Sequence, residues 1–218
     1  MKTAKIKNST RELEMGKIVC VGRNYAEHAK ELGNEVPEFP LIFLKPVSAL
    51  ISSGKNIIHP DFSDDMHHEV ELVLLLDKTV KNASLQEAED AIAGYAVGLD
   101  MTLRDIQNEL KKRGHPWTIA KCFDTSAVIS PFMLKSEYKL KGNERIVLEV
   151  NGEARQNSTL DKMIFSPAEI VKYISSKLTL ESGDLIYTGT PEGVGKVVKG
   201  DKLKAYIENV GELTTQVV

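Results

Sequence analysis

The stretch from His67 to Leu76 carries the clearest pattern of polar and apolar positions in the chain. Branched and apolar residues dominate it, which favours a β-strand. Because residues two apart in a strand point to the same face, Glu69 and Glu71 would lie side by side. Val73 and Leu75 would share that face, and the opposite face, which suits a core, would carry Val70, Leu72, Leu74 and Leu76. The pattern therefore predicts two neighbouring carboxylates on an otherwise apolar strand.

Two interpretations of this pair are open. Two buried carboxylates would raise each other's pKa, and a hard divalent cation bound by both would remove the repulsion. Oxygen ligands favour Mg²⁺, Mn²⁺ or Ca²⁺ over zinc. Alternatively, the stretch is an edge strand that leaves Glu69 and Glu71 in solvent. Taken alone, the stretch favours neither interpretation.

Short apolar runs bounded by turn residues predict further strands, and capped segments predict helices between them. The predicted strands are 17–22, 41–44, 67–76, 95–99, 117–123, 145–150, 184–188 and 201–208, followed by a last strand. The predicted helices are 26–32, 84–93 (capping box Ser84 and Glu87, ended by Gly94), 102–113 (N-cap Thr102) and 166–177. Asn151-Gly152 predicts a hairpin turn. Short strands predominate, so we expect an α+β fold, mostly β, in one domain over 1–218, with 1–16 an N-terminal extension or edge strand.

Four further polar groups fall where a site could use them. His28 and Glu31 are three apart in a predicted helix, so the carboxylate could orient the ring as a general base, although an exposed helical pair is the simpler interpretation. Asp100 ends a predicted strand, as a site residue or a helix cap. Lys121 lies within an apolar predicted strand, where it either extends to the surface or supplies buried positive charge. Cys122 would face the other way, as a small core residue.

Composition narrows the classes of function. The 218 residues are 42% hydrophobic and 27% charged, with a formal net charge of −3 and two cysteines. No basic cluster stands out, which argues against nucleic-acid binding. The longest apolar run is too short to span a membrane, and residues 1–16 lack the apolar region of a signal peptide. We therefore expect a cytoplasmic, globular protein in a reducing compartment.

Taken together and in this order, several motifs resemble those of the fumarylacetoacetate hydrolase family. They extend from about residue 17 to the C-terminus, and the chain looks most like the short branch of acylpyruvases and oxaloacetate decarboxylases. The motifs are Val21-Gly22-Arg23-Asn24-Tyr25 with His28 and Glu31, Phe43-Leu44-Lys45-Pro46, His68-Glu69-Val70-Glu71-Leu72, Gly98-Leu99-Asp100-Met101-Thr102 with Arg104-Asp105 and Gln107, Trp117-Thr118-Ile119-Ala120-Lys121, and Thr188-Gly189-Thr190-Pro191-Glu192-Gly193-Val194-Gly195.

The resemblance implies a mixed β-sandwich roll and a homodimer. It implies Mg²⁺, with Mn²⁺ as a substitute, held by three carboxylates. It also implies a catalytic dyad on a lid helix and a set of groups that line the substrate site. The implied metal ligands are Glu69, Glu71 and Asp100. The implied catalytic residues are His28, Glu31 and Lys121. The implied substrate-binding residues are Arg23, Arg104, Gln107 and Thr190.

The implied activity is Mg²⁺-dependent cleavage of a small 2-oxo acid through an enolate. In an acylpyruvate, water activated by His28 and Glu31 would attack the C4 carbonyl, whereas oxaloacetate would lose C4 as CO₂ without an attacking water. Relatives that isomerise or decarboxylate a dienol dicarboxylate of the 2-hydroxyhepta-2,4-diene-1,7-dioate type give the alternative enzyme activity. A non-catalytic metal- or oxo-acid-binding protein is the alternative from another class.

Overall fold

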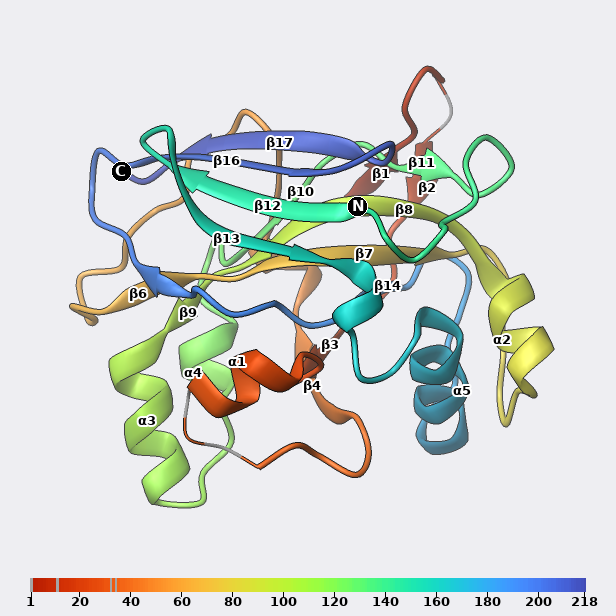
Figure 1. Ribbon diagram of the computed structural model, residues 1–218, viewed down its shortest axis with the longest axis horizontal. Helices are drawn as coiled ribbons and strands as arrows, with labels where there is room; N and C mark the ends of the chain where they lie inside the picture. Colours follow the sequence, from red (N-terminus) through yellow and green to blue (C-terminus); the bar gives the residue numbers. More distant parts are fainter. Residues whose placement is uncertain (1, 11, 32, 34) are drawn as a thin grey trace.

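The structure, a computed structural model, describes residues 2–10, 12–31, 33 and 35–218, and β-strands dominate it (Figure 1). The largest sheet contains, in order, β4 (Leu41–Lys45), β3 (Ile18–Gly22), β14 (Leu185–Tyr187), β7 (Val70–Leu76), β8 (Ile92–Asp100), β10 (Ala127–Ile129) and β5 (Leu50–Ser52), with β11 (Met133–Leu134) paired to β8. A second sheet contains β13 (Glu153–Thr159), β12 (Arg145–Val150), β16 (Lys202–Ile207) and β17 (Gly211–Gln216). Two small sheets contain β15 (Gly195–Lys196), β6 (Met66–His68) and β9 (Thr102–Leu103), and β1 (Thr3–Lys5) and β2 (Glu12–Glu14).

The helices lie at two ends of the large sheet (Figure 1). They are α1 (Ala26–Glu31), α2 (Leu85–Ala91), α3 (Arg104–Lys112), α4 (Thr118–Lys121) and α5 (Pro167–Lys177), with 3-10 turns at Val47–Ala49 and Leu160–Lys162. Helix α3 packs with α4 near α1, and α2 packs with α5 at the other end. In the part of the chain that the structure describes, no helix is both long and apolar enough to cross a membrane.

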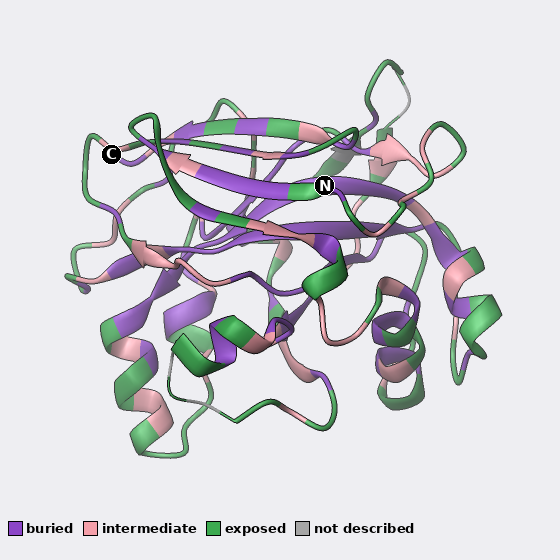
Figure 2. Ribbon diagram, in the orientation of Figure 1, coloured by how far each residue is buried: buried purple, intermediate pink, exposed green. Residues whose placement is uncertain are grey.

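Strand β7 is buried along its whole length (Figure 2), and it has core on both faces. One set of its side chains, which includes Leu72 and Leu74, packs in the core that contains Leu148 of β12 and Ala205 of β16. The alternate set, Val73 and Leu75, packs in a second core on the opposite face. The alternation predicted for this stretch is confirmed. The edge-strand interpretation is wrong, because β7 lies between β14 and β8.

Local signals placed several elements correctly. Asn151 and Gly152 turn the chain between β12 and β13 with φ of 54° and 85°, which suits the two residues of a tight hairpin turn. The capping box of Ser84 and Glu87 is present at the start of α2. Gly33 follows α1 with φ of 65°, as a helix stop requires. Leu32, the predicted end of this helix, lies outside the described residues.

The predicted strand at 117–123 is wrong, because the chain forms the single helical turn α4. The Lys121 N–H donates to Trp117 O at 3.0 Å, and Ala120 and Lys121 are buried side by side. This hydrogen bond joins residues four apart and closes one turn of α-helix, which a strand cannot form. Cys122 is half-buried and donates from Sγ to Leu44 O at 3.1 Å. It is therefore not the core residue that the strand pattern predicted.

Two predicted helix boundaries are also wrong. Helix α2 ends at Ala91 and strand β8 begins at once, so Gly94 lies within a strand. There, an added Cβ would be 2.8 Å from Met133 O, which explains the need for glycine. Thr102 does not cap α3, because it belongs to β9, where it pairs with His67.

The first residues of the chain form a hairpin that attaches to the main body. Strand β1 pairs with β2, Lys7 N–H donates to Phe132 O at 2.8 Å, and Gly16 N–H donates to Gly183 O at 3.0 Å. These bonds tie 2–16 to segments that are distant in sequence. Met1 and Arg11, within the predicted extension or edge strand at 1–16, lie outside the described residues.

Candidate active site

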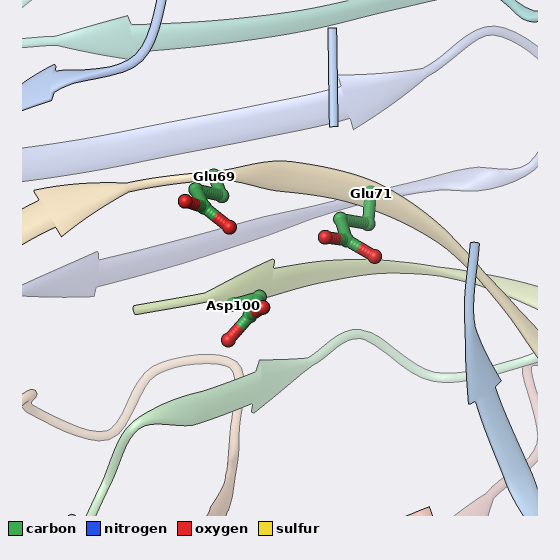
Figure 3. Close-up of side chains that lie close together, drawn as sticks. All are labelled: Glu69, Glu71 and Asp100. Atoms are coloured by element: carbon green, nitrogen blue, oxygen red, sulfur yellow. The ribbon is translucent and has the colours of Figure 1, made fainter. Parts of the chain in front are cut away.

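Three carboxylates, from β7, from β8 and from the residue that precedes β7, meet at one end of β7 (Figure 3). Glu69 immediately precedes β7, Glu71 lies within it, and Asp100 ends β8. The Asp100 N–H donates to Glu69 O at 2.9 Å, which fixes the two strands in register at this point. One carboxylate oxygen from each residue lies within 4.8 Å of the others, and all three side chains are buried. The strand pairing therefore builds a compact, acidic cluster inside the protein.

Cations neutralise two members of this cluster. Lys121 Nζ donates to Glu69 Oε2 at 2.7 Å and to Asp100 Oδ2 at 2.6 Å. Arg104 donates to the other Glu69 oxygen, and Lys45 Nζ lies 2.8 Å from Asp100 Oδ1. Lys121 is only 3% exposed, so its extension to the surface is excluded. The use of Asp100 as a helix cap is likewise excluded, because its side chain is engaged in these ion pairs.

Glu71 differs from the other two carboxylates because no lysine or arginine of the described residues forms an ion pair with it. Its Oε2 accepts a hydrogen bond from Gly189 N–H at 2.7 Å. Burial, and then the charges of Asp100 and Glu69, raise the pKa of Glu71 well above its ordinary value. Burial acts the same way on Glu69, but Lys121 and Arg104 outweigh it and hold the pKa of Glu69 well below its usual range.

The donor set fits a hard divalent cation. It consists of carboxylate oxygens alone, which Mg²⁺ and Mn²⁺ prefer, and no thiolate lies in it. A divalent cation between these oxygens would also remove the repulsion that raises the pKa of Glu71. The metal-site interpretation of the Glu69 and Glu71 pattern therefore agrees with the geometry.

Lys45 supports the cluster and was not among the predicted site residues. Besides Asp100, its Nζ contacts Ser126 Oγ at 2.9 Å and the backbone oxygen of Lys121. Lys45 is 2% exposed. Its contacts with Asp100 and Lys121 therefore join the end of β8 to the end of α4 inside the protein. A lysine that ends an apolar strand was the available sequence signal, but it does not reveal which distant groups the lysine meets.

His28 and Glu31 of α1 form the predicted pair. His28 Nδ1 lies 3.2 Å from Glu31 Oε2, and Glu31 Oε1 also accepts from Gly193 N–H at 3.0 Å. His28 is 4% exposed, so the interpretation as an exposed helical pair is wrong. Burial lowers the pKa of His28 despite the nearby Glu69 and Glu31 carboxylates. A neutral ring whose Nδ1 proton faces Glu31 keeps a lone pair on Nε2 and can accept a proton there.

Side-chain amides orient two of the predicted substrate-binding groups. Gln107 Oε1 accepts from Arg104 Nη1 at 2.6 Å, one turn along α3. Gln156 Nε2 donates to Thr190 Oγ1 at 2.8 Å, which leaves the threonine proton available to a ligand. Gln156 was missed in the sequence, because it lies in β13 and reaches the site only through tertiary packing.

The backbone at Arg23 is held in an uncommon conformation. Its φ is 60°, in the left-handed region that non-glycine residues rarely adopt. The next residue, Asn24, fixes the turn, because its Nδ2 donates to Thr188 O at 2.8 Å and its Oδ1 accepts from Phe165 N–H at 2.8 Å. Such conformations persist where the surroundings determine them, often at functional sites.

These groups surround one small polar cavity. It is lined by Val21, Gly22, Arg23, His28, Phe43, Glu69, Glu71, Asp100, Arg104, Gln107, Lys111, Trp117, Lys121 and Thr190. Every predicted site residue lines it except Glu31, which reaches it through His28. The free space is about 30 Å³, on the order of one water molecule, because the ion pairs occupy the interior. A larger, mainly apolar groove of about 720 Å³ adjoins it and shares Phe43, Trp117 and Lys121.

Comparison with known proteins places the chain among enzymes. The family described as "Fumarylacetoacetate (FAA) hydrolase C-terminal" matches residues 17–218. The mitochondrial oxaloacetate tautomerase of Bos taurus is 46% identical over 90% of this chain and 90% of its own. The fumarylpyruvate hydrolase of Pseudomonas aeruginosa, solved with Mn²⁺ and pyruvate, is 40% identical, with a TM-score of 0.96, over 100% of this chain and 95% of its own. The 2-hydroxyhepta-2,4-diene-1,7-dioate isomerase of Mycobacterium marinum is 35% identical, with a TM-score of 0.83, over 99% and 77%.

Proposed function

Because the chain belongs to the fumarylacetoacetate hydrolase family, we propose that it cleaves small 2-oxo acids with Mg²⁺, hydrolysing acylpyruvates, decarboxylating oxaloacetate, or both. The observation that carries this proposal is the buried cluster of Glu69, Glu71 and Asp100, in which Glu71 has no lysine or arginine partner among the residues that the structure describes. Mg²⁺, or Mn²⁺ in its place, would be held by these three residues and supplies a Lewis acid beside the 2-oxo acid. We take residues 1–218 as one catalytic domain.

The charges of the site support an anionic substrate. The three carboxylates of the cluster are matched in number by three cations, Lys45, Arg104 and Lys121, which contact Glu69 and Asp100. A bound divalent cation therefore leaves an excess of two positive charges in a buried space. An enolate that also carries a carboxylate would balance this excess, and electrostatic stabilisation of this kind is strong in a site that excludes water.

The chain's own residues have distinct roles in the proposal. Neutral His28 accepts a proton from water at Nε2 while Glu31 stabilises the ring, so hydroxide attacks the C4 carbonyl of an acylpyruvate. The C3–C4 bond then breaks, the acyl group leaves as a carboxylic acid, and the electron pair remains on pyruvate as its enolate, which is protonated at C3. Lys121 stabilises the negative charge that develops on the substrate. Arg23, Arg104, Gln107 and Thr190 orient the substrate, and α1 covers the site with the dyad.

Proton transfer at C3 is a second candidate activity. The buried, neutral His28 lines the cavity and could move a proton on or off C3 without any bond to carbon breaking. Such a transfer is a tautomerase or isomerase reaction, and two of the relatives are named for reactions of this kind. A dienol dicarboxylate is the alternative substrate for it. Hydrolysis, decarboxylation and isomerisation would share the enolate and differ in what leaves C3.

We also propose that the protein is a homodimer in the cytoplasm. Family membership supports the dimer, which light scattering would test. Cys20 and Cys122 are both free, which suits a reducing compartment.

Exchange of the C3 protons of pyruvate in D₂O tests the proposed function without requiring the natural substrate. With Mg²⁺ we expect the methyl signal in the proton NMR spectrum to disappear faster than in a protein-free sample, because forming the enolate removes a C3 proton. EDTA should return the rate to that of the blank, and added Mn²⁺ should restore it. Exchange that is no faster than the blank, in protein shown to have bound Mg²⁺, would refute enolate formation at this site.

A further inference from the structure

Four lysine or arginine side chains line the small polar cavity, and two of them carry unbalanced charge. Arg104 and Lys121 are ion-paired with Glu69. Arg23 and Lys111 line the same cavity, but neither has an ion pair with any described residue. Unpaired cations that face a cavity are ready to bind an anion.

Lys111 reaches the cavity from the far end of α3. It follows Arg104 by seven residues and Gln107 by four, so the three lie on one face of the helix. Seven residues span about 10 Å along a helix axis, so Lys111 is attached well away from the metal cluster. Its Nζ lies 5.4 Å from the centre of the Trp117 ring, which holds the ammonium against the cavity wall. Lys112, by contrast, is exposed.

The electrostatics of Lys111 suit a partner that is brought by the ligand. Burial, followed by the charges of Arg104 and Arg23, lowers the pKa of Lys111 to about 8. A ligand carboxylate beside it would favour the charged form. The distance between the backbone of Lys111 and the metal cluster also fits such a ligand. A 2-oxo acid whose oxo-acid end is bound at the cluster would extend its other end away from the cluster.

We propose that Lys111, together with Arg23, binds a distal carboxylate of the substrate, so that the site selects dicarboxylic 2-oxo acids over those with a neutral tail. This inference rests on the proposed function and deepens it, because it specifies the chemical class of the substrate's second end. Lys111 and Arg23 add positive charge beyond the two excess charges that a bound divalent cation would leave at the cluster, and a second carboxylate on the substrate would balance part of it.

A matched pair of ligands tests this selection directly. 2-Oxopentanedioate and 2-oxopentanoate share the 2-oxo acid head and differ at the tail, which is a carboxylate in one and a methyl group in the other. With Mg²⁺ present, calorimetry should show that the wild-type protein binds the dicarboxylate at least about tenfold more tightly, as a charge-assisted hydrogen bond provides. In Lys111→Met the two affinities should come within about twofold of each other.

Two further variants separate recognition from general damage. Lys111→Arg should retain most of the preference, because it keeps the charge, and Lys112→Met should retain all of it. A merely structural defect would weaken both ligands equally and leave their ratio unchanged. The inference is refuted if the wild-type protein binds both ligands equally or neither, or if Lys111→Met keeps the preference.

Turnover then distinguishes this inference from the proposed function. With oxaloacetate and acetylpyruvate as substrates, kcat/KM of Lys111→Met should fall at least about fivefold more for oxaloacetate, which carries the distal carboxylate. Equal losses on both substrates would refute the role of Lys111 and leave the proposed function standing. If the wild-type protein consumes neither substrate but keeps its ligand preference, the proposed function fails and the assignment of Lys111 stands.

Discussion

Replacing Glu71 with alanine is expected to abolish metal binding and, with it, both acylpyruvate cleavage and oxaloacetate decarboxylation. Glu71 is the one member of the acidic cluster without a lysine or arginine partner among the described residues, so we expect the metal to depend on it most. The loss in kcat should exceed the roughly 10- to 100-fold that removal of an outer-shell partner costs. Calorimetric titration with Mg²⁺ and assays of both substrates would measure it.

The isosteric variant Glu71→Gln separates loss of metal from loss of fold. Without metal, glutamine removes a buried carboxylate and can still accept the Gly189 hydrogen bond, so the metal-free variant should melt at or above the wild-type temperature. Mg²⁺ should raise the melting temperature of the wild-type protein but not of the variant. Glu153→Gln, on the exposed start of β13, is the control and should behave as wild type. Full activity in Glu71→Ala would contradict the metal assignment.

His28→Ala is expected to affect the two reactions differently. Hydrolysis of an acylpyruvate needs a base to activate water, and loss of a general base typically costs 10²- to 10⁴-fold, so the rate of cleavage should fall by about that factor. Decarboxylation needs no attacking water, so it should keep a much larger part of its rate. Parallel assays of acetylpyruvate and oxaloacetate would show the contrast, with His59→Ala, which does not line the cavity, as the control. Equal losses in both reactions would argue against separate roles.

The pH profile provides a second test of His28. Burial lowers its pKa below the ordinary value of 6.5, and the base must be neutral to act. The midpoint of the acid-side decline in the rate of acylpyruvate cleavage should therefore lie below pH 6.5. In Glu31→Gln a group that raises this pKa is lost, so the decline should move to lower pH while the maximal rate falls. A decline that moves to higher pH would contradict the assignment.

Local patterns predicted those parts of the fold that local physics decides. The period of two in β7 placed its side chains on the correct faces, and the turn at Asn151-Gly152 and the capping box at Ser84 formed as expected. The wrong prediction of a strand at 117–123 arose because the local pattern does not decide the structure there. Its apolar residues suit either a strand or a helical turn, and the ion pairs of Lys121 with two distant carboxylates accompany the turn.

The candidate site shows the same division. Strand geometry predicted that Glu69 and Glu71 would lie side by side. The resemblance carried by the ordered motifs predicted the other site groups, and the structure places these around one cavity. Lys45, Gln156 and Lys111 were not predicted, because their partners are distant in sequence or would be supplied by a ligand. A lysine that holds a buried carboxylate has the same sequence appearance as one in solvent.

The central claim is that a divalent cation at this cluster drives cleavage of a 2-oxo acid. The most direct test assays acetylpyruvate and oxaloacetate with the same preparation, each with Mg²⁺ and with EDTA. The account predicts consumption of at least one substrate with Mg²⁺ and its loss in EDTA, with the ratio of the two rates identifying the main reaction. Consumption that persists in EDTA, or no consumption of either substrate by protein shown to have bound Mg²⁺, would contradict it.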